Sequence, residues 1–135
     1  MSEMHYHRGC VWSCVYHVVW CVKYRRPIFE DNDVLIKYTC DLLKDIANKN
    51  NVEIIECNTD KDHVHILLEI SPNVSISNAI KVLKGASARR ILKDFSNLKS
   101  QLYGGHVWNP SYFISTVSDD TEENIRVYIE KQGVK

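Results

Sequence analysis

The sequence predicts secondary-structure elements in the order β-α-β-β-α-β-α, which indicates an α+β domain with a ferredoxin-like (RRM-like) antiparallel sheet and an added C-terminal helix. Three observations predict this class. Two long segments repeat apolar residues with the period of a helix, four segments have the composition of strands, and no linker, repeat or low-complexity tract divides the 135 residues. We therefore expect one domain over residues 1–135, with two helices on one face of the sheet and the other face free.

The first part of the chain predicts a strand and a helix. The segment from Cys10 to Val22 is rich in Val, Trp, Tyr and Cys, and we expect one long strand there. Pro27 follows shortly after it, and proline cannot continue a β-ladder. From about Asp33 to Lys49 the apolar residues recur at helical spacing, which predicts a helix packed on one face. Its apolar positions are Leu35, Leu42, Leu43 and Ile46.

The middle of the chain predicts three further strands and a second helix. Val52 to Thr59 and His63 to Ile70 are expected to be strands around the polar turn Asp60-Lys61-Asp62. Ser75 to Phe95 has helical spacing, and Tyr112 to Val117 predicts a short fourth strand after a loop at Gly104-Gly105. The apolar side of the second helix consists of Ile76, Ile80, Leu83, Ile91 and Phe95.

The chain is expected to close with a helix from about Asp119 to Gln132. Asp119 and Asp120, followed by Glu122 and Glu123, supply capping-box chemistry and place negative charge at the positive end of the helix dipole.

Length and composition exclude several classes of protein. The chain is too short for a large enzyme barrel, no apolar run approaches the roughly 18 residues of a membrane span, and the N-terminus has no apolar signal-peptide segment. The five cysteines include no C-x-x-C pair, which argues against a disulfide framework or a zinc ribbon and favours a reducing cytoplasm. Cys14 and Cys21 are interpreted as small core residues. Lys plus Arg equals Asp plus Glu at 17 each, so any binding of nucleic acid must use local basic patches.

The most informative stretch is His63-Val64-His65-Ile66-Leu67-Leu68-Glu69-Ile70. Because side chains alternate across a strand, His63 and His65 point together from one face, and the residues on the opposite face are expected to lie against the helices. Those residues are Val64, Ile66, Leu68 and Ile70. Paired imidazoles suit a borderline transition metal, and they tolerate Mg²⁺ or Mn²⁺ when oxygen ligands complete the site. Two exposed histidines on an open face give the same short pattern, so both interpretations stay open at this point.

Tyr128 and Gln132 are the second pair of interest. They lie four residues apart and therefore on one face of the last helix, with Ile125 and Ile129 as apolar anchors nearby. Lys131 lies beside this face, where its charge suits an anion. A tyrosine in such a position is ordinarily a core or dimer-packing residue, so the pair alone does not establish a catalytic role.

Taken in order, these motifs resemble those of the HUH single-tyrosine transposases, the transposase A enzymes of the smallest insertion sequences, which move as single-stranded DNA. The resemblance extends from about Tyr16 to Gln132 and depends on the combination of His-x-His with Tyr-x-x-x-Gln. The supporting stretches are Tyr16 to Pro27, Asp62-His63-Val64-His65 and Asn109-Pro110-Ser111-Tyr112-Phe113.

This resemblance implies a metal-dependent enzyme that recognises DNA hairpins and cleaves and rejoins single-stranded DNA at insertion-sequence ends. Tyr128 would be the nucleophile, linked to the 5′-phosphate and leaving a free 3′-OH. His63, His65 and Gln132 would hold a divalent metal, Mg²⁺ or Mn²⁺, that polarises the scissile phosphate. Such help matters because only about one tyrosine in a thousand is phenolate at pH 7. The resemblance also implies a prokaryotic cytoplasmic protein, associated with the nucleoid when bound to DNA.

A homodimer with active sites shared between chains is expected on two grounds. Val18, Val19, Trp20 and Val22 offer an apolar surface or edge that a lone small domain rarely leaves open. The resemblance implies, in addition, that the tyrosine helix of one subunit docks against the histidine pair of the other. Gly104-Gly105 and the short connection from Val117 to Asp119 would let that helix reach across.

Basic and aromatic side chains are candidates for contacts with DNA. The basic ones are Lys23, Arg25 and Arg26 after the first strand and Lys81, Lys84, Arg89, Arg90 and Lys93 on the second helix, and Trp12, Trp20, Tyr24 and Trp108 are able to stack on unpaired bases. A solvated helix face and core aromatics explain the same residues. Two alternatives therefore stay open beside the transposase: a non-catalytic nucleic-acid-binding module on the same fold, and a small metal-binding or structural dimer unrelated to DNA.

Overall fold

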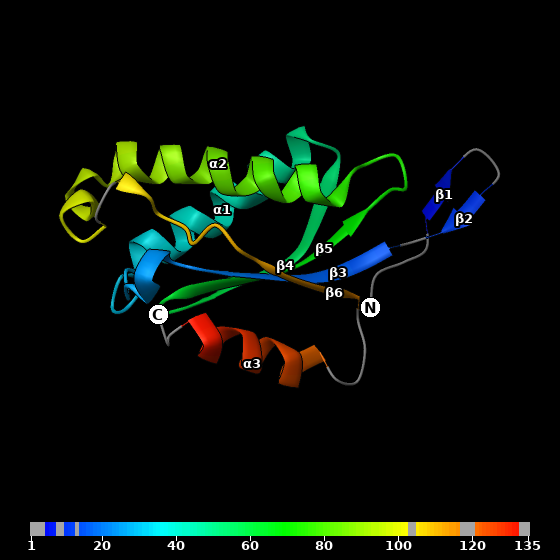
Figure 1. Cartoon of the computed structure of the whole chain (residues 1–135). Coiled ribbons are helices and arrows are strands. Elements are labelled where there is room, and N and C mark those ends of the chain that lie inside the picture. Colours follow the sequence, from blue (N-terminus) through cyan, green and yellow to red (C-terminus); the bar gives the residue numbers. More distant parts are fainter. Residues whose placement is uncertain (1–4, 8–9, 13, 103–104, 117–120, 133–135) are drawn as a thin grey trace.

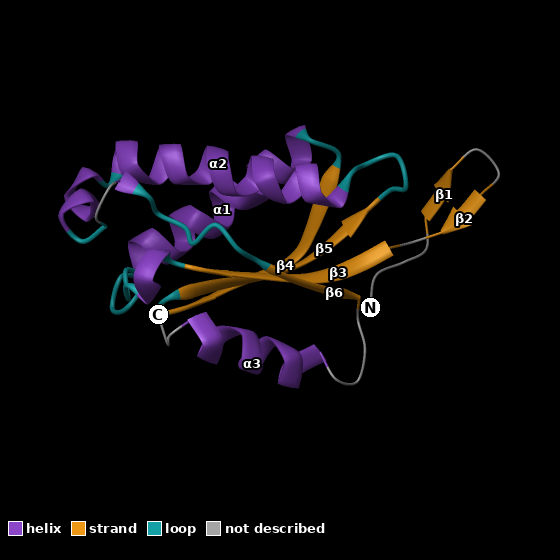
Figure 2. Cartoon of the chain, viewed as in Figure 1, coloured by secondary structure: helices purple, strands orange, loops and turns teal. Residues whose placement is uncertain are grey.

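The computed structural model describes residues 5–7, 10–12, 14–102, 105–116 and 121–132 of the chain (Figure 2). The α-helices among them are α1 (Asp33–Lys49), α2 (Ile76–Asp94) and α3 (Thr121–Gln132). The strands are β1 (His5–His7), β2 (Cys10–Trp12), β3 (Cys14–Cys21), β4 (Val52–Asp60), β5 (His63–Ile70) and β6 (Phe113–Thr116). Two short 3₁₀ helices, η1 (Lys23–Arg25) and η2 (Ser96–Ser100), follow β3 and α2.

The main sheet has the strand order β4-β5-β3-β6, and each neighbouring pair is antiparallel. Helices α1 and α2 cover one face of this sheet, and α3 lies against the other face (Figure 1). Helix α3 contacts β3 and β6 there. The ferredoxin-like α+β architecture with an added C-terminal helix is thereby confirmed, but the face expected to be free is covered in part by that helix.

The two long helices begin and end close to the predicted residues. Helix α1 occupies the predicted range, and α2 lies between Ser75 and Phe95. Both helices have polar N-caps: Leu35 N donates to Asn32 Oδ1 at 3.1 Å, and Asn78 N donates to Ser75 Oγ at 3.3 Å. The predicted capping residues of the last helix, Asp119 and Asp120, lie outside the described residues.

The main core lies between the sheet and the pair α1 and α2. Alternate residues of β3 and β5 point into it, so that Val18, Trp20, Val64 and Ile66 have no exposed surface. The helices contribute Leu35, Leu43, Ile80, Leu83 and Ile91. Trp108 joins this cluster, and its ring meets the ring of Trp20 edge to face with centroids 5.8 Å apart. Trp20 and Trp108 are therefore core residues, whereas Tyr24 is exposed. The side chain of Trp12, the fourth candidate aromatic, lies outside the described part of the chain.

The first predicted strand is divided in the structure. Strand β2 pairs with β1 in a separate two-stranded sheet, whereas β3 lies in the main sheet. The composition of Cys10 to Val22 predicts extended backbone in both pieces. It does not specify which sheet each piece joins, because the pairing partner of a strand is set by residues far away in sequence. Val22 lies beyond β3 and forms an isolated bridge with Trp108.

The expectation that this strand offers an apolar surface to a partner subunit is wrong. Strand β3 lies between β5 and β6, so it is not an edge of the sheet. Val18, Val19, Trp20 and Val22 are all 0% exposed within a single chain. The physical reason for a homodimer is thereby removed, and the homodimer now depends on the family resemblance alone. Among the described residues, no helix has the length and apolarity needed to cross a lipid bilayer.

Candidate active site

His63 and His65 lie on β5 and face away from the main core. Their neighbours Val64 and Ile66 are fully buried on the core side, and alternation along the strand directs both histidines to the face that carries α3. Both histidines are half-buried. The predicted common orientation of the pair agrees with this burial pattern.

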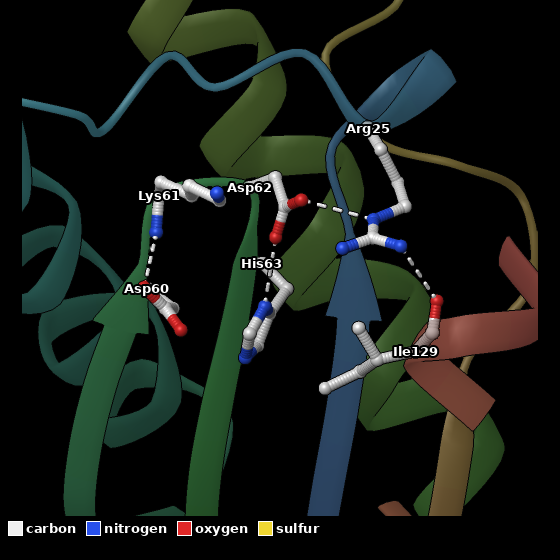
Figure 3. Close-up of polar contacts among 6 residues, drawn as sticks. All are labelled: Arg25, Asp60, Lys61, Asp62, His63 and Ile129. Carbon is white, nitrogen blue, oxygen red and sulfur yellow. Dashed lines mark hydrogen bonds and ion pairs between the residues drawn. The ribbon is translucent and has the colours of Figure 1, made fainter. Parts of the chain in front are cut away.

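Asp62 holds the ring of His63 from the turn that precedes β5 (Figure 3). His63 Nδ1 donates to Asp62 Oδ1 at 3.0 Å, which leaves Nε2 as the nitrogen with a free lone pair in the neutral ring. Asp62 is only 5% exposed, and a buried carboxylate requires partners. Arg25 supplies the second one, because its Nε donates to Asp62 Oδ2 at 2.9 Å.

A third histidine lies beside the pair. His17 on β3 places its Nδ1 2.9 Å from Nε2 of His65, and the two rings are tilted with centroids 5.1 Å apart. At this distance one nitrogen donates a proton and the other accepts it. His17 was not singled out in the sequence. Its position directly before the buried Val18 does place it on the histidine face once β3 is recognised as a strand.

Tyr128 and Gln132 lie on α3 and share one partner, Ser111. The hydroxyls of Ser111 and Tyr128 are 3.0 Å apart, and Ser111 Oγ lies 3.4 Å from Gln132 Oε1. The Tyr128 ring also contacts that of Phe113, with centroids 5.9 Å apart. Burial raises the pKa of Tyr128 above its ordinary value, and the hydrogen bond with Ser111 acts in the opposite direction. Sequence reasoning missed Ser111, although it lies in the Asn109–Phe113 stretch that carried the resemblance.

Cys21 links the two halves of the candidate site. It pairs with His63 in the register of β3 and β5, and negative charge on its sulfur would raise the pKa of Tyr128. Burial, with a further contribution from Asp62, raises the pKa of the Cys21 thiol itself to about 11, so the thiol is protonated at neutral pH. Cys21 is thus the buried core residue that the sequence predicted. Because Cys21 lies beside His63 in the register and interacts electrostatically with Tyr128, Tyr128 and His63 belong to the same end of the sheet.

The described residues include no group of three or more His, Cys, Asp or Glu side chains arranged to hold a metal ion. The metal site of His63, His65 and Gln132 therefore stays a prediction. The donor set itself suits a divalent cation, since it offers two imidazoles and one amide oxygen, and Asp62 fixes the first imidazole as outer-shell carboxylates do for metal ligands.

The candidate DNA-binding residues lie on two elements, helix α2 and the segment directly after β3, and they differ in exposure. Lys81, Arg89, Arg90 and Lys93 are exposed on α2, which lies on the face of the sheet opposite to α3 (Figure 1). Lys84, on the same helix, is half-buried and donates from Nζ to the carbonyls of Asn109 and Ser111 at 2.6 and 2.9 Å. Arg25 is directed inward to Asp62. Lys23 and Arg26 are half-buried near the end of β3.

Comparisons with known proteins agree in what they indicate. The family model described as "Transposase IS200 like" matches residues 10–132. The chain is 46% identical over 135 residues to the ISDra2 transposase TnpA of Deinococcus radiodurans, covering 98% of this chain and 94% of that protein. It is 34% identical over 121 residues to the transposase for insertion sequence element IS200 of Salmonella typhimurium, covering 90% of this chain and 78% of that protein.

Two solved structures have the same fold. A crystal structure of a candidate transposase from Deinococcus radiodurans R1 aligns with a TM-score of 0.89 and 41% identity, over 96% of this chain and 98% of that one. A structure of a REP-associated tyrosine transposase bound to a REP hairpin aligns with a TM-score of 0.55 over 94% of this chain and 68% of that one, and its 14% identity makes it a likeness of fold alone. With the family match over almost the whole chain and the two curated relatives, these findings show that the chain belongs to the IS200-like transposase family.

Proposed function

We propose that this transposase cleaves and rejoins single-stranded DNA at the ends of an insertion sequence, with Tyr128 as the nucleophile. The observation that carries the proposal is the position of the Tyr128 hydroxyl, which is held by Ser111 at the end of the sheet that also bears His63 and Asp62. Half-burial removes part of the surrounding water, and the hydrogen bond fixes the oxygen that has to attack.

The chemistry conserves the energy of the phosphodiester bond. Attack of the Tyr128 oxygen on the scissile phosphorus forms a 5′-phosphotyrosine, and the 3′ oxygen leaves with a proton as a free 3′-OH. A 3′-OH that later attacks the phosphotyrosine joins two strands and releases Tyr128. No ATP is needed, because one phosphate ester is exchanged for another.

His63, His65 and Gln132 are the residues that would hold a divalent cation, Mg²⁺ or Mn²⁺. When bound, the cation supplies Lewis-acid polarisation of the scissile phosphate and stabilises the charge that develops on it. The protein contributes the orientation of His63 through Asp62, whose carboxylate is itself held by Arg25.

Hairpin DNA is the substrate form that we propose. The similar fold of the REP-associated tyrosine transposase, described as bound to a REP hairpin, supports this. The formal charge of the chain is zero, so the protein as a whole has no net electrostatic attraction to DNA. The exposed basic side chains of α2 would instead provide local, sequence-independent contacts with phosphates.

The test uses hairpin oligonucleotides that cover the DNA flanking the gene of this protein, labelled at either end and incubated with Mg²⁺. A 3′-end label should migrate with the protein in a denaturing gel, because the phosphotyrosine retains the 3′ part of the strand. A 5′-end label should appear in a shortened free fragment. The same strand annealed to its complement should give no adduct. Salt-dependent binding without any adduct would instead support a non-catalytic nucleic-acid-binding module.

We further propose, as the family resemblance implies, that the working unit is a homodimer whose active sites are shared between chains. Within the single chain α3 packs against β3 and β6 of its own sheet, so sharing requires α3 to change places with the same helix of the partner. The test is to co-express Tyr128→Phe with His63→Ala and to isolate the mixed dimers. With shared sites, the intact histidines of one chain meet the intact tyrosine of the other, and one site of the two is active. Verified mixed dimers without cleavage would contradict the shared arrangement, and a monomer at assay concentration would contradict the dimer.

A further inference from the structure

Arg25 joins three parts of the chain through one guanidinium group (Figure 3). The residue itself belongs to η1, directly after β3. Its Nε donates to Asp62 Oδ2 at 2.9 Å, and its Nη1 donates to the carbonyl oxygen of Ile129 on α3 at 3.1 Å. The partner of His63 and the helix that bears Tyr128 are thus connected by a single side chain.

The backbone at this position is strained. Tyr24 and Arg25 have φ angles of 59° and 52°, in the left-handed region that residues other than glycine rarely adopt. Neighbouring backbone bonds hold this turn, since Val22 N donates to Asp62 O at 2.9 Å and Lys23 N donates to Val107 O at 2.8 Å. Strain of this kind persists where the surrounding structure imposes it and is frequent at functional sites. Here it directs the Arg25 side chain back toward Asp62 and α3.

The contact with α3 lies in the last turn of the helix. Ile129 O belongs to the last four carbonyls of a helix that ends at Gln132, and these carbonyls have no amide four residues further along inside the helix. Positive charge at a helix C-terminus is also favourable because it opposes the negative end of the helix dipole. Arginine suits both tasks, because its planar fork can donate to a carboxylate and a carbonyl at once, whereas lysine offers one flexible point charge.

We propose that Arg25 is a positioning residue that fixes the nucleophile helix α3 relative to the histidine strand β5 by bridging Asp62 and the Ile129 carbonyl. The proposal rests on the proposed roles of Tyr128 and His63. It assigns Arg25 to the geometry of the active site rather than to the basic patch, where the sequence placed it. It also gives Asp62 a second role. The Asp62 carboxylate orients His63 through one oxygen and Arg25 through the other, and Arg25 in turn contacts α3.

The test compares Arg25→Gln with Arg126→Gln in the whole protein. Arg126 lies exposed on α3 and pairs with Glu130 at 2.7 Å, so its substitution removes the same charge from the same helix. Hydrogen–deuterium exchange without DNA should show the α3 amides of Arg25→Gln exchanging about fivefold faster, with α1 unchanged. Asp62→Asn should accelerate the same amides, although the described hydrogen bonds of Asp62 do not involve α3. Arg126→Gln should change little, because exposed ion pairs contribute little to stability.

A second readout separates positioning from DNA binding. Arg25→Gln should slow adduct formation about tenfold at saturating hairpin DNA while the Kd for DNA stays within about twofold. A weakened Kd with unchanged α3 exchange would show that Arg25 contacts DNA, and this would overturn the proposal. Unchanged α3 exchange with an unchanged Kd would overturn it as well. If the wild-type protein forms no adduct, the proposed function fails, whereas the exchange measurement still decides whether Arg25 holds α3.

Discussion

The hydroxyl groups of Ser111 and Tyr128 lie 3.0 Å apart, so the segment that leads into β6 is in direct contact with helix α3. The carbonyl of the same Ser111 accepts a hydrogen bond from Lys84 on α2 at 2.9 Å. Ser111 therefore connects Tyr128, on one face of the sheet, to a helix that covers the opposite face (Figure 1).

Replacing Ser111 by alanine should move the pH–rate profile of adduct formation to higher pH. The hydrogen bond from Ser111 lowers the pKa of Tyr128, which burial has already raised, so its loss raises the pKa further and reduces the phenolate fraction at any pH below it. One hydrogen bond of this kind predicts a rate about three- to tenfold lower near neutral pH. The control is Ser100→Ala in η2, whose hydroxyl donates to the nearby Asn97 carbonyl. A profile unchanged in position would contradict this role of Ser111.

Lys84 should make stability depend on pH in alkaline solution. Burial lowers its pKa from 10.5 to about 8 in the folded protein, so between these values the unfolded chain binds more protons and the free energy of unfolding rises with pH. The difference in unfolding free energy between wild type and Lys84→Met should therefore increase in favour of wild type from pH 8 to 10.5. Denaturant titrations at several pH values measure it. Lys81→Met, at an exposed position on the same helix, is the matched control.

The fold was predictable where the signal is local. Leu35 and Leu43 on α1, or Val64 and Ile66 on β5, follow the period of their element, and each is buried as that period requires. The division of the first strand was not predictable in this way. Cys10–Trp12 and Cys14–Cys21 have similar compositions but pair with different strands. The exposure of Val19 was predicted wrongly for a related reason. The face of β3 is contacted by α3, which lies about one hundred residues later in the chain, and the local sequence of β3 does not reveal this.

The site followed the same rule. The common orientation of His63 and His65 was predictable because residues two apart on one strand share a face whatever the tertiary structure. Asp62 and Ser111 were present in the stretches that carried the family resemblance, but their tasks depend on contacts with Arg25 and Tyr128 that only the folded chain makes. Arg25 was grouped with the basic patch because the sequence shows only a basic residue near Lys23 and Arg26. It does not show whether the side chain points to solvent or to Asp62.

Removing the candidate metal ligands should abolish cleavage and spare DNA binding. His63→Ala and His65→Ala should each stop adduct formation while the Kd for hairpin DNA changes by no more than a few-fold, because affinity depends mainly on phosphate and base contacts. Gln132→Ala should be milder, since water can replace an amide oxygen. EDTA should stop cleavage, and Mg²⁺ or Mn²⁺ should restore it. Titration with Mn²⁺ provides a readout independent of activity, with the exposed His106→Ala as the control. Full activity in EDTA would contradict a metal role.

Reversing charge on the exposed face of α2 should weaken hairpin binding. Lys81→Glu combined with Arg89→Glu should lower the slope of log K against log salt by roughly one unit for each DNA phosphate that the protein no longer neutralises. Lys84 is left intact, because it holds the Asn109 and Ser111 carbonyls and its removal would disturb the segment beside Tyr128. The matched control is Lys37→Glu with Lys49→Glu on α1, which changes the net charge equally. An unchanged slope in the α2 variant would identify that face as an ordinary solvated surface.

The most direct test of the account is to locate the covalent bond between protein and DNA. After reaction with the hairpin oligonucleotide and Mg²⁺, proteolysis and mass spectrometry should find a nucleotide 5′-phosphate on the peptide that contains Tyr128. Tyr128→Phe removes one oxygen and its hydrogen bond with Ser111, so it should retain its fold and bind the hairpin but give no adduct. A phosphate found on another residue, with Tyr112 the next candidate, or an adduct that persists in Tyr128→Phe, would contradict the account.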